Sequence, residues 1–285
     1  MLQFYDTNRP EQMTYTLRLL FFSLFMLPAM SSADETRVLA SVHPLALIAA
    51  SVADNLETLV PQSTTPHDFA FRPSDIRKVQ NADIIFWAGA ESEPYLARFE
   101  KRWPDKVWID ISAPVHQQAT SDDHNHDAHW WLNPELAITA QQALAAALNK
   151  ESEFEQQLRA QLELSQQQLG PLKQQGFFVF HRAYDHWVNY FGLNQLGSFT
   201  LSPEQKPGLK RLNAMRQQLA SGDVRCIFTE PQFEPKLVSS VTRGLDIPAG
   251  ELDPLGIHIS VTKDGYAEFV RDLTQRFVSC LSTGK

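Results

Sequence analysis

The alternation of short apolar strands with helices constrains the fold of this 285-residue chain more than any other feature. In the first half we expect strands at 38–42, 56–60, 84–88 and 107–111, and helices from 44 to about 54, from 74, and from 134 to 148. In the second half we expect strands at 177–180 and 226–229, and helices at 208–220, 234–243 and 266–281. This alternation is typical of mainly parallel sheets that helices cover on both faces. The sequence therefore predicts an α/β fold with two similar lobes.

A long polar helix is expected between the two lobes, from Ser152 to about Gln168. Its buried positions should follow one narrow stripe, namely Phe154, Leu158, Leu162, Ser165 and Leu169. A helix with a single narrow apolar face packs along one side of a globule. We therefore predict a rigid linking helix at 151–174, an N-terminal lobe at 34–150, a C-terminal lobe at 175–285 and a ligand cleft between the lobes.

The first 33 residues have the features of a secretory signal peptide. The apolar run from Leu19 to Leu27 is too short to span a bilayer, and small residues precede a cleavage point after Ala33. Either Met1 or Met13 can be the start. No cysteine follows the run, so we expect an exported, soluble protein without a membrane anchor.

Charge and cysteine content narrow the class of protein further. The net charge is −8 and no basic run exists, which argues against nucleic acid as a partner. The two cysteines, Cys226 and Cys280, are most simply explained as a disulfide in an exported protein. The alternatives are two buried thiols or a cysteine metal site, and the second lacks neighbouring ligands at a suitable spacing.

Histidines mark the candidate functional site. His124, His126 and His129 lie within one short acidic stretch, which suits a borderline divalent cation such as zinc. His129 is the best placed of the three because it directly precedes the apolar Trp130, whereas His124 and His126 form an accessory polar loop. The alternative is a solvated loop whose histidines bind nothing.

Two further histidines and one aspartate occupy comparable positions. His67 follows the second expected strand, His181 follows the strand at 177–180, and Asp253 lies in a loop of the second lobe. Three imidazoles with an optional oxygen ligand form a zinc site, so we predict His67, His129, His181 and Asp253 as the metal ligands. We expect structural or surface roles for the remaining candidates, which are His43, His116, His186, His258 and Glu230.

Several motifs, in order along the chain, resemble those of the cluster A-I (cluster 9) metal-binding proteins of ABC importers. They are Pro66-His67-Asp68-Phe69, Arg72-Pro73-Ser74-Asp75, Asn81-Ala82-Asp83, His129-Trp130-Trp131-Leu132-Asn133-Pro134, Phe180-His181, Thr229-Glu230-Pro231-Gln232 and Leu252-Asp253-Pro254-Leu255-Gly256. The resemblance extends from about Val38 to Cys280, and within the family it is to the periplasmic zinc-uptake proteins.

This resemblance implies a monomeric periplasmic protein that binds Zn²⁺ with His67, His129 and His181 and delivers it to an inner-membrane ABC permease. Manganese-binding relatives have a glutamate in place of His181, which favours zinc, and similar zinc proteins have a disulfide at the positions of Cys226 and Cys280. Some relatives have a glutamate ligand where this chain has Pro66, so water or Asp253 is left as the fourth ligand.

Two alternative functions follow from the same residues. One is a manganese carrier of the same family. The other is a zinc hydrolase, for which Asp253 would be the only candidate general base.

Overall fold

The structure is a computed structural model that describes residues 1, 3, 35–62, 64–116, 127–201, 207–234 and 236–283. Nearly all of the predicted signal peptide, together with His124 and His126 of the accessory loop, lies outside these residues. Within the described part of the chain, every helix is too short or too polar to span a bilayer.

The first half of the chain forms a four-stranded parallel sheet with the strand order β2-β1-β3-β4. Its strands are β1 (Val38–Ala40), β2 (Leu56–Thr58), β3 (Ile84–Trp87) and β4 (Val107–Asp110). All four side chains of β3 are buried, as expected for a central strand with helices on both faces. The four strands predicted for this half are confirmed, with slightly shorter bounds.

The second half forms an equivalent parallel sheet with the order β6-β5-β7-β8. Its strands are β5 (Gly176–His181), β6 (Asn194–Thr200), β7 (Val224–Thr229) and β8 (Ala249–Glu251). Strand β6 was not predicted from the sequence. It is an edge strand whose first five residues are only half-buried, so it lacks the continuous apolar run that marks β5.

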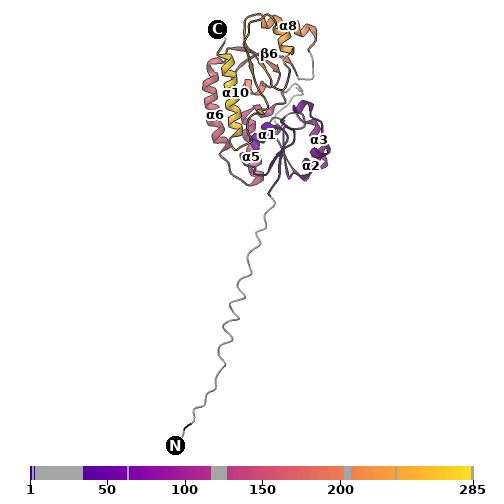
Figure 1. Cartoon of the computed structure of the whole chain (residues 1–285), viewed down its shortest axis with the longest axis vertical. Coiled ribbons are helices and arrows are strands. Elements are labelled where there is room, and N and C mark those ends of the chain that lie inside the picture. The colour runs from indigo at the N-terminus through magenta and orange to yellow at the C-terminus, as the bar shows by residue number, and fades with distance from the viewer. Residues whose placement is uncertain are drawn as a thin grey trace. The chain divides into compact units, whose positions relative to one another are not determined.

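Ten helices and three short 3₁₀ helices connect the strands of the described residues (Figure 1). In the first half these are α1 (His43–Ala49), η1 (Pro66–Asp68), α2 (Pro73–Asn81), α3 (Pro94–Arg102), α4 (Ala113–His116), η2 (Trp130–Leu132) and α5 (Pro134–Leu148). In the second half they are α6 (Phe154–Leu169), η3 (Gly170–Leu172), α7 (Asp185–Phe191), α8 (Leu209–Leu219), α9 (Lys236–Thr242) and α10 (Gly265–Leu281). Proline occupies the first turn of α1, α2, α3 and α5, where its missing N–H costs no helix hydrogen bond.

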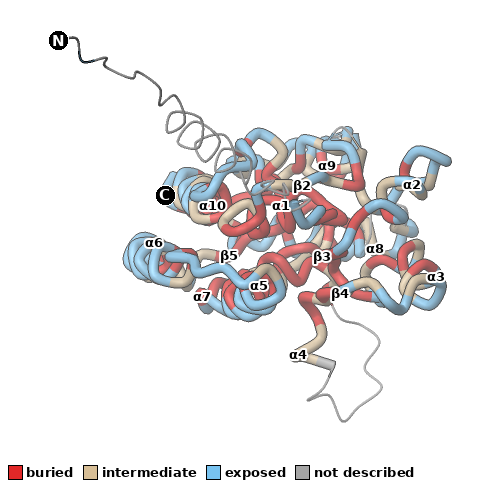
Figure 2. The backbone as a smooth tube through the Cα atoms, turned by 90° about the horizontal axis from the view of Figure 1, so that it is seen from below, coloured by how far each residue is buried: buried red, intermediate tan, exposed pale blue. Residues whose placement is uncertain are grey.

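Helix α6 buries the predicted stripe and no other residue. The buried positions are Phe154, Leu158, Leu162, Ser165 and Leu169, and this face packs against α10 (Figure 1). The opposite faces of α6 and α10 are exposed, while the central strands β3 and β5 are buried (Figure 2).

A single hydrophobic cluster includes residues from both sheets and from both of these helices. The predicted fold class, two parallel sheets flanked by helices, is thus confirmed. The lobe boundaries and the linking role of α6 stay predictions.

The interface between α6 and α10 contains a buried polar contact. The Thr274 hydroxyl donates to the backbone carbonyl of Val270 at 2.8 Å and lies 2.8 Å from Ser165 Oγ, from which it accepts, and both Thr274 and Ser165 are almost fully buried. Removing one partner of a buried hydrogen bond leaves the other unsatisfied.

We therefore expect Thr274→Val to lower the free energy of unfolding by about 1–3 kcal/mol in urea denaturation. The matched control is Thr139→Val, because Thr139 makes the same hydroxyl-to-backbone contact on an exposed helix face. Equal losses in the two variants would show that the buried contact contributes nothing specific.

The predicted disulfide between Cys226 and Cys280 is confirmed, and it joins β7 to α10. Gly250 lies against this bridge. A methyl group at Gly250 would come 3.1 Å from Cys280 Cβ and 3.2 Å from its Sγ, which is closer than ordinary packing. Glycine at this position therefore lets β8 approach the bridge.

Candidate metal centre

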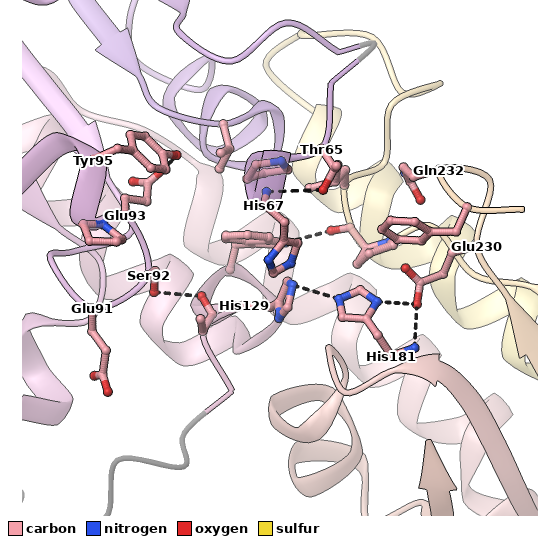
Figure 3. Close-up of a pocket in the computed structure, with 18 residues that line it drawn as sticks. Thr65, His67, Glu91, Ser92, Glu93, Tyr95, His129, His181, Glu230 and Gln232 are labelled. Atoms are coloured by element: carbon pink, nitrogen blue, oxygen red, sulfur yellow. Dashed lines mark hydrogen bonds and ion pairs between the residues drawn. The ribbon is translucent and has the colours of Figure 1, made fainter. Parts of the chain in front are cut away.

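Three of the predicted ligands, His67, His129 and His181, meet at one point (Figure 3). One ring nitrogen of each lies within 4.8 Å of the corresponding nitrogens of the other two. His67 lies on η1 after β2, His129 immediately precedes η2, and His181 is the last residue of β5. His129 and His181 are buried, whereas His67 is exposed.

A buried carboxylate lies behind each of the two buried imidazoles. Asp127 Oδ1 is 2.6 Å from Nδ1 of His129, and Glu230 Oε1 is 2.8 Å from Nδ1 of His181. An ionised carboxylate only accepts hydrogen bonds, so when Asp127 and Glu230 are ionised each Nδ1 carries the proton and donates it. This arrangement leaves each Nε2 unprotonated and directs it toward the other imidazole, and it is the usual support of metal-binding histidines.

The two Nε2 atoms of His129 and His181 face each other at 3.3 Å. With both Nδ1 atoms protonated, neither Nε2 can donate to the other, so two lone pairs converge on one point. A cation between them would remove this repulsion. Two nitrogens bound to a tetrahedral zinc ion at about 2.0–2.1 Å lie about 3.3–3.4 Å apart, which is the spacing observed here.

The two carboxylates can also balance the charge of a divalent cation, because each contributes one negative charge when ionised. Burial raises the pKa of Glu230 well above its usual value, and its second oxygen, Oε2, accepts no hydrogen bond from the described residues. Burial acts in the same direction on Asp127, but the charge and hydrogen bonds of His129 outweigh it and lower the pKa of Asp127. An uncompensated buried carboxylate is unfavourable, so the site is prepared for positive charge.

Asp253, the fourth predicted ligand, does not join the three histidines. Its Oδ1 accepts from the side-chain amide of Gln232 at 2.7 Å and from the backbone N–H of Leu255 at 3.0 Å. Its Oδ2 accepts from the N–H of Ile257 at 2.8 Å. The carboxylate thus holds the loop that follows β8.

The cavity around the three histidines has a volume of about 340 Å³, and residues of both halves of the chain line it. Glu93 supports one wall, because its carboxylate accepts from the N–H of Ala88 and from the hydroxyl of Tyr95, each at 2.7 Å. Burial raises the pKa of Glu93 to about 6. Glu93 was not predicted from the sequence.

The histidines expected to have other roles do lie outside the three-imidazole cluster. His43 is buried and bonds to the carbonyl of Ile259 at 3.0 Å, and His258 lies 3.2 Å from Asp272 on the surface. His116 ends α4. His186 donates from Nε2 to the backbone carbonyl of Asp127 at 2.8 Å.

Two carboxylates that support the histidines were not predicted to do so from the sequence. Glu230 was expected to have a structural or surface role, and Asp127 was not singled out within its acidic stretch. The spacing Asp127-Ala128-His129 carries a usable signal, because a carboxylate two residues before a histidine can fold back onto its Nδ1. Glu230 is distant in sequence from His181, so no local signal could pair them.

Glu230→Gln should lower the affinity of the site for Zn²⁺ by about 10–100-fold, the usual effect of changing a partner of a metal-binding histidine. Glutamine can still accept from Nδ1 of His181, so the variant mainly removes the negative charge. Zinc titration by calorimetry, with the exposed Glu234→Gln as control, tests this expectation. Unchanged affinity in Glu230→Gln would show that the carboxylate charge does not contribute.

Comparison with known proteins gives the family to which the chain belongs. Two parallel α/β sheets around a cluster of three imidazoles define the class of metal-binding proteins with two α/β halves. Residues 38–280 match the ZnuA family, described as "Zinc-uptake complex component A periplasmic", and the chain belongs to this family.

A relative from Yersinia pestis, named high-affinity zinc uptake system protein ZnuA, is 34% identical over 86% of this chain and 91% of its own length. Two solved structures share the fold. The periplasmic zinc-binding protein TroA from Treponema pallidum has a TM-score of 0.73 and 17% identity, and covers 87% of this chain and 99% of its own. The laminin-binding protein Lmb of Streptococcus agalactiae has a TM-score of 0.72 and 21% identity, and covers 86% and 99%.

Proposed function

We propose that this protein captures Zn²⁺ as cargo at His67, His129 and His181 and delivers it to an ABC permease. The observation that carries the proposal is the pair of Nε2 lone pairs held 3.3 Å apart by two carboxylate-bonded imidazoles. Membership of the ZnuA family and the name of the Yersinia pestis relative support zinc uptake as the process.

Membership of this family also supports a location and a partner. We infer that residues 1–33 direct export to the periplasm, where the mature monomer meets an inner-membrane permease. The family description includes the word periplasmic, and the sequence of the first 33 residues supports the export step.

Zinc is favoured over manganese because all three converging side chains offer nitrogen atoms. Imidazole suits zinc, whereas manganese prefers oxygen ligands, and zinc also binds more tightly at nitrogen sites. A zinc hydrolase has less support. Asp253 was the only predicted general base, and three hydrogen bonds from its own loop and from Gln232 occupy its carboxylate.

Calorimetric titration of the metal-stripped mature protein with Zn²⁺ tests the proposal. We expect one tight site in the wild type and none in the variant that combines His67→Ala, His129→Ala and His181→Ala, although this variant keeps His124 and His126. A competing titration with Mn²⁺ should leave zinc bound. Tight binding that persists in the triple variant would place the site elsewhere and overturn the proposal.

A further inference from the structure

The segment that carries His129 is held by helix α7 of the second half of the chain. Asp127 Oδ2 accepts from the backbone N–H of Asp185, the first residue of α7, at 2.9 Å. The backbone carbonyl of Asp127 accepts from Nε2 of His186 at 2.8 Å. Asp127 therefore contacts α7 twice while its other carboxylate oxygen holds His129.

The position of His186 is well defined. Its ring packs on the indole of Trp130, with the ring centroids 4.6 Å apart. Because a backbone carbonyl can only accept, Nε2 of His186 must carry the proton in this contact. The imidazole thus combines one directional hydrogen bond with one aromatic contact, both to the segment that contains His129.

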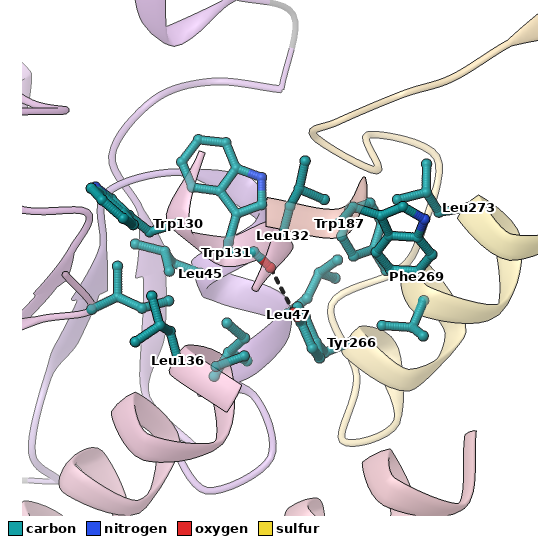
Figure 4. Close-up of a cluster of buried hydrophobic side chains, with 14 of the residues drawn as sticks. Leu45, Leu47, Trp130, Trp131, Leu132, Leu136, Trp187, Tyr266, Phe269 and Leu273 are labelled. Carbon is teal, nitrogen blue, oxygen red and sulfur yellow. Dashed lines mark hydrogen bonds between the residues drawn. The ribbon is translucent and has the colours of Figure 1, made fainter. Parts of the chain in front are cut away.

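The same segment is held at its other end by the second half. Nε1 of Trp131 donates to the carbonyl of Pro254 at 2.7 Å, and the Tyr266 hydroxyl donates to the carbonyl of Trp131 at 2.6 Å (Figure 4). Contacts to the second half of the chain therefore lie on both sides of His129, although His129 itself belongs to the first half.

Helix α7 is itself fixed to the strand that ends in His181. It begins shortly after β5, and the Asp185 carboxylate accepts from Arg182 at 2.5 Å and from Gln195 of β6 at 3.3 Å. A continuous chain of contacts thus leads from His181 through α7, His186 and Asp127 to His129.

We propose that His186 is a positioning residue of the metal centre, which holds Asp127 and thereby sets the distance between the imidazoles of His129 and His181. This inference rests on the proposed function in that the distance serves metal binding. His186 does not touch the metal. It acts through the backbone of Asp127, so the spacing of the two buried ligands is determined by contacts with α7.

Two variants separate the two contacts of His186. His186→Gln keeps a side-chain donor for the Asp127 carbonyl but loses the aromatic contact, whereas His186→Phe keeps the aromatic contact and loses the donor. Asn189→Ala, an exposed substitution on the same helix, is the control. We expect zinc affinity to fall about tenfold in His186→Phe and to stay near wild type in His186→Gln and in the control.

The Co²⁺ absorption spectrum of each variant reports the geometry of the site, and a general loss of stability would not change it. We expect an altered spectrum in His186→Phe alone. Wild-type affinity and spectrum in His186→Phe would overturn the proposal. Equal losses in His186→Phe and His186→Gln would also overturn it, because the hydrogen bond would then not be the cause.

Nitrogen NMR of the metal-free protein separates this inference from the proposed function. It should show His129 protonated at Nδ1 in the wild type, with a larger share protonated at Nε2 in His186→Phe. If the wild type bound no zinc, the proposed function would fail, and the protonation of His129 would still decide the role of His186.

Discussion

Replacing Cys226 and Cys280 together by serine should lower the free energy of unfolding of the metal-free protein by about 4 kcal/mol. The two cysteines are 54 residues apart, so the disulfide closes a long loop. Closing a loop of that length removes conformational freedom from the unfolded chain, and in the chain-entropy account this is the source of the stabilisation. The bridge also joins β7 to α10 in a buried position.

Urea denaturation of the variant and of the oxidised and reduced wild type measures this effect. The reduced wild type is the control, because it has lost the crosslink without any substitution. Both non-crosslinked forms should show the same loss. A loss below about 1 kcal/mol in both would mean that the reduced unfolded chain retains structure that compensates for the missing crosslink.

The parts of the fold that the sequence predicted are those with strong local patterns. The continuous apolar runs of β3 and β5 identify buried strands, and the single stripe of α6 identifies its packed face. Strand β6 and helix α3 were not predicted. Strand β6 is half-buried at an edge, and α3 has only two buried side chains, Leu96 and Phe99, so neither pattern is distinct.

The candidate site likewise contains residues that could be predicted from the sequence and residues that could not. His67, His129 and His181 could be proposed from their positions at strand ends, because parallel strands bring their carboxyl ends to one edge. Their partners could not. The contact between Glu230 and His181, and the one between His186 and Asp127, join residues that are 49 and 59 positions apart in sequence. Asp253 was also proposed from its position in a loop. That position did not reveal that its carboxylate oxygens accept hydrogen bonds from the backbone of the same loop.

Acidification from pH 7.5 to 5.5 should weaken zinc binding by up to about a thousandfold. An imidazole must be neutral to bind a metal, and its reference pKa is about 6.5. Proton competition at one imidazole with the reference pKa costs about tenfold over this interval, so a thousandfold loss is the upper bound for the three imidazoles that converge on the site. Zinc titrations at several pH values measure the slope, and affinity that does not change with pH would exclude the histidines as ligands.

Zinc should be lost while the metal-free protein remains folded. The pKa shifts of two of its buried groups change the free energy of unfolding in opposite directions as the pH falls. Burial lowers the pKa of His43 below 6.5, so the unfolded chain takes up the proton first, and this group costs up to about 1.4 kcal/mol of stability at pH 5.5. Glu93 acts in the other direction. Its pKa is raised from 4.5 to about 6, so the folded protein binds the proton more readily and gains stability as the pH falls through this window.

Asp127 should not contribute in this range. Its pKa is lowered, so its stabilisation is lost only as the pH falls below its ordinary value of 3.8. Circular dichroism melts of the metal-free protein at pH 7.5 and 5.5, recorded beside the titrations, separate the two processes. Unfolding at pH 5.5 would mean that zinc is lost through collapse of the fold, and a folded metal-free protein would assign the loss to protonation of the ligands themselves.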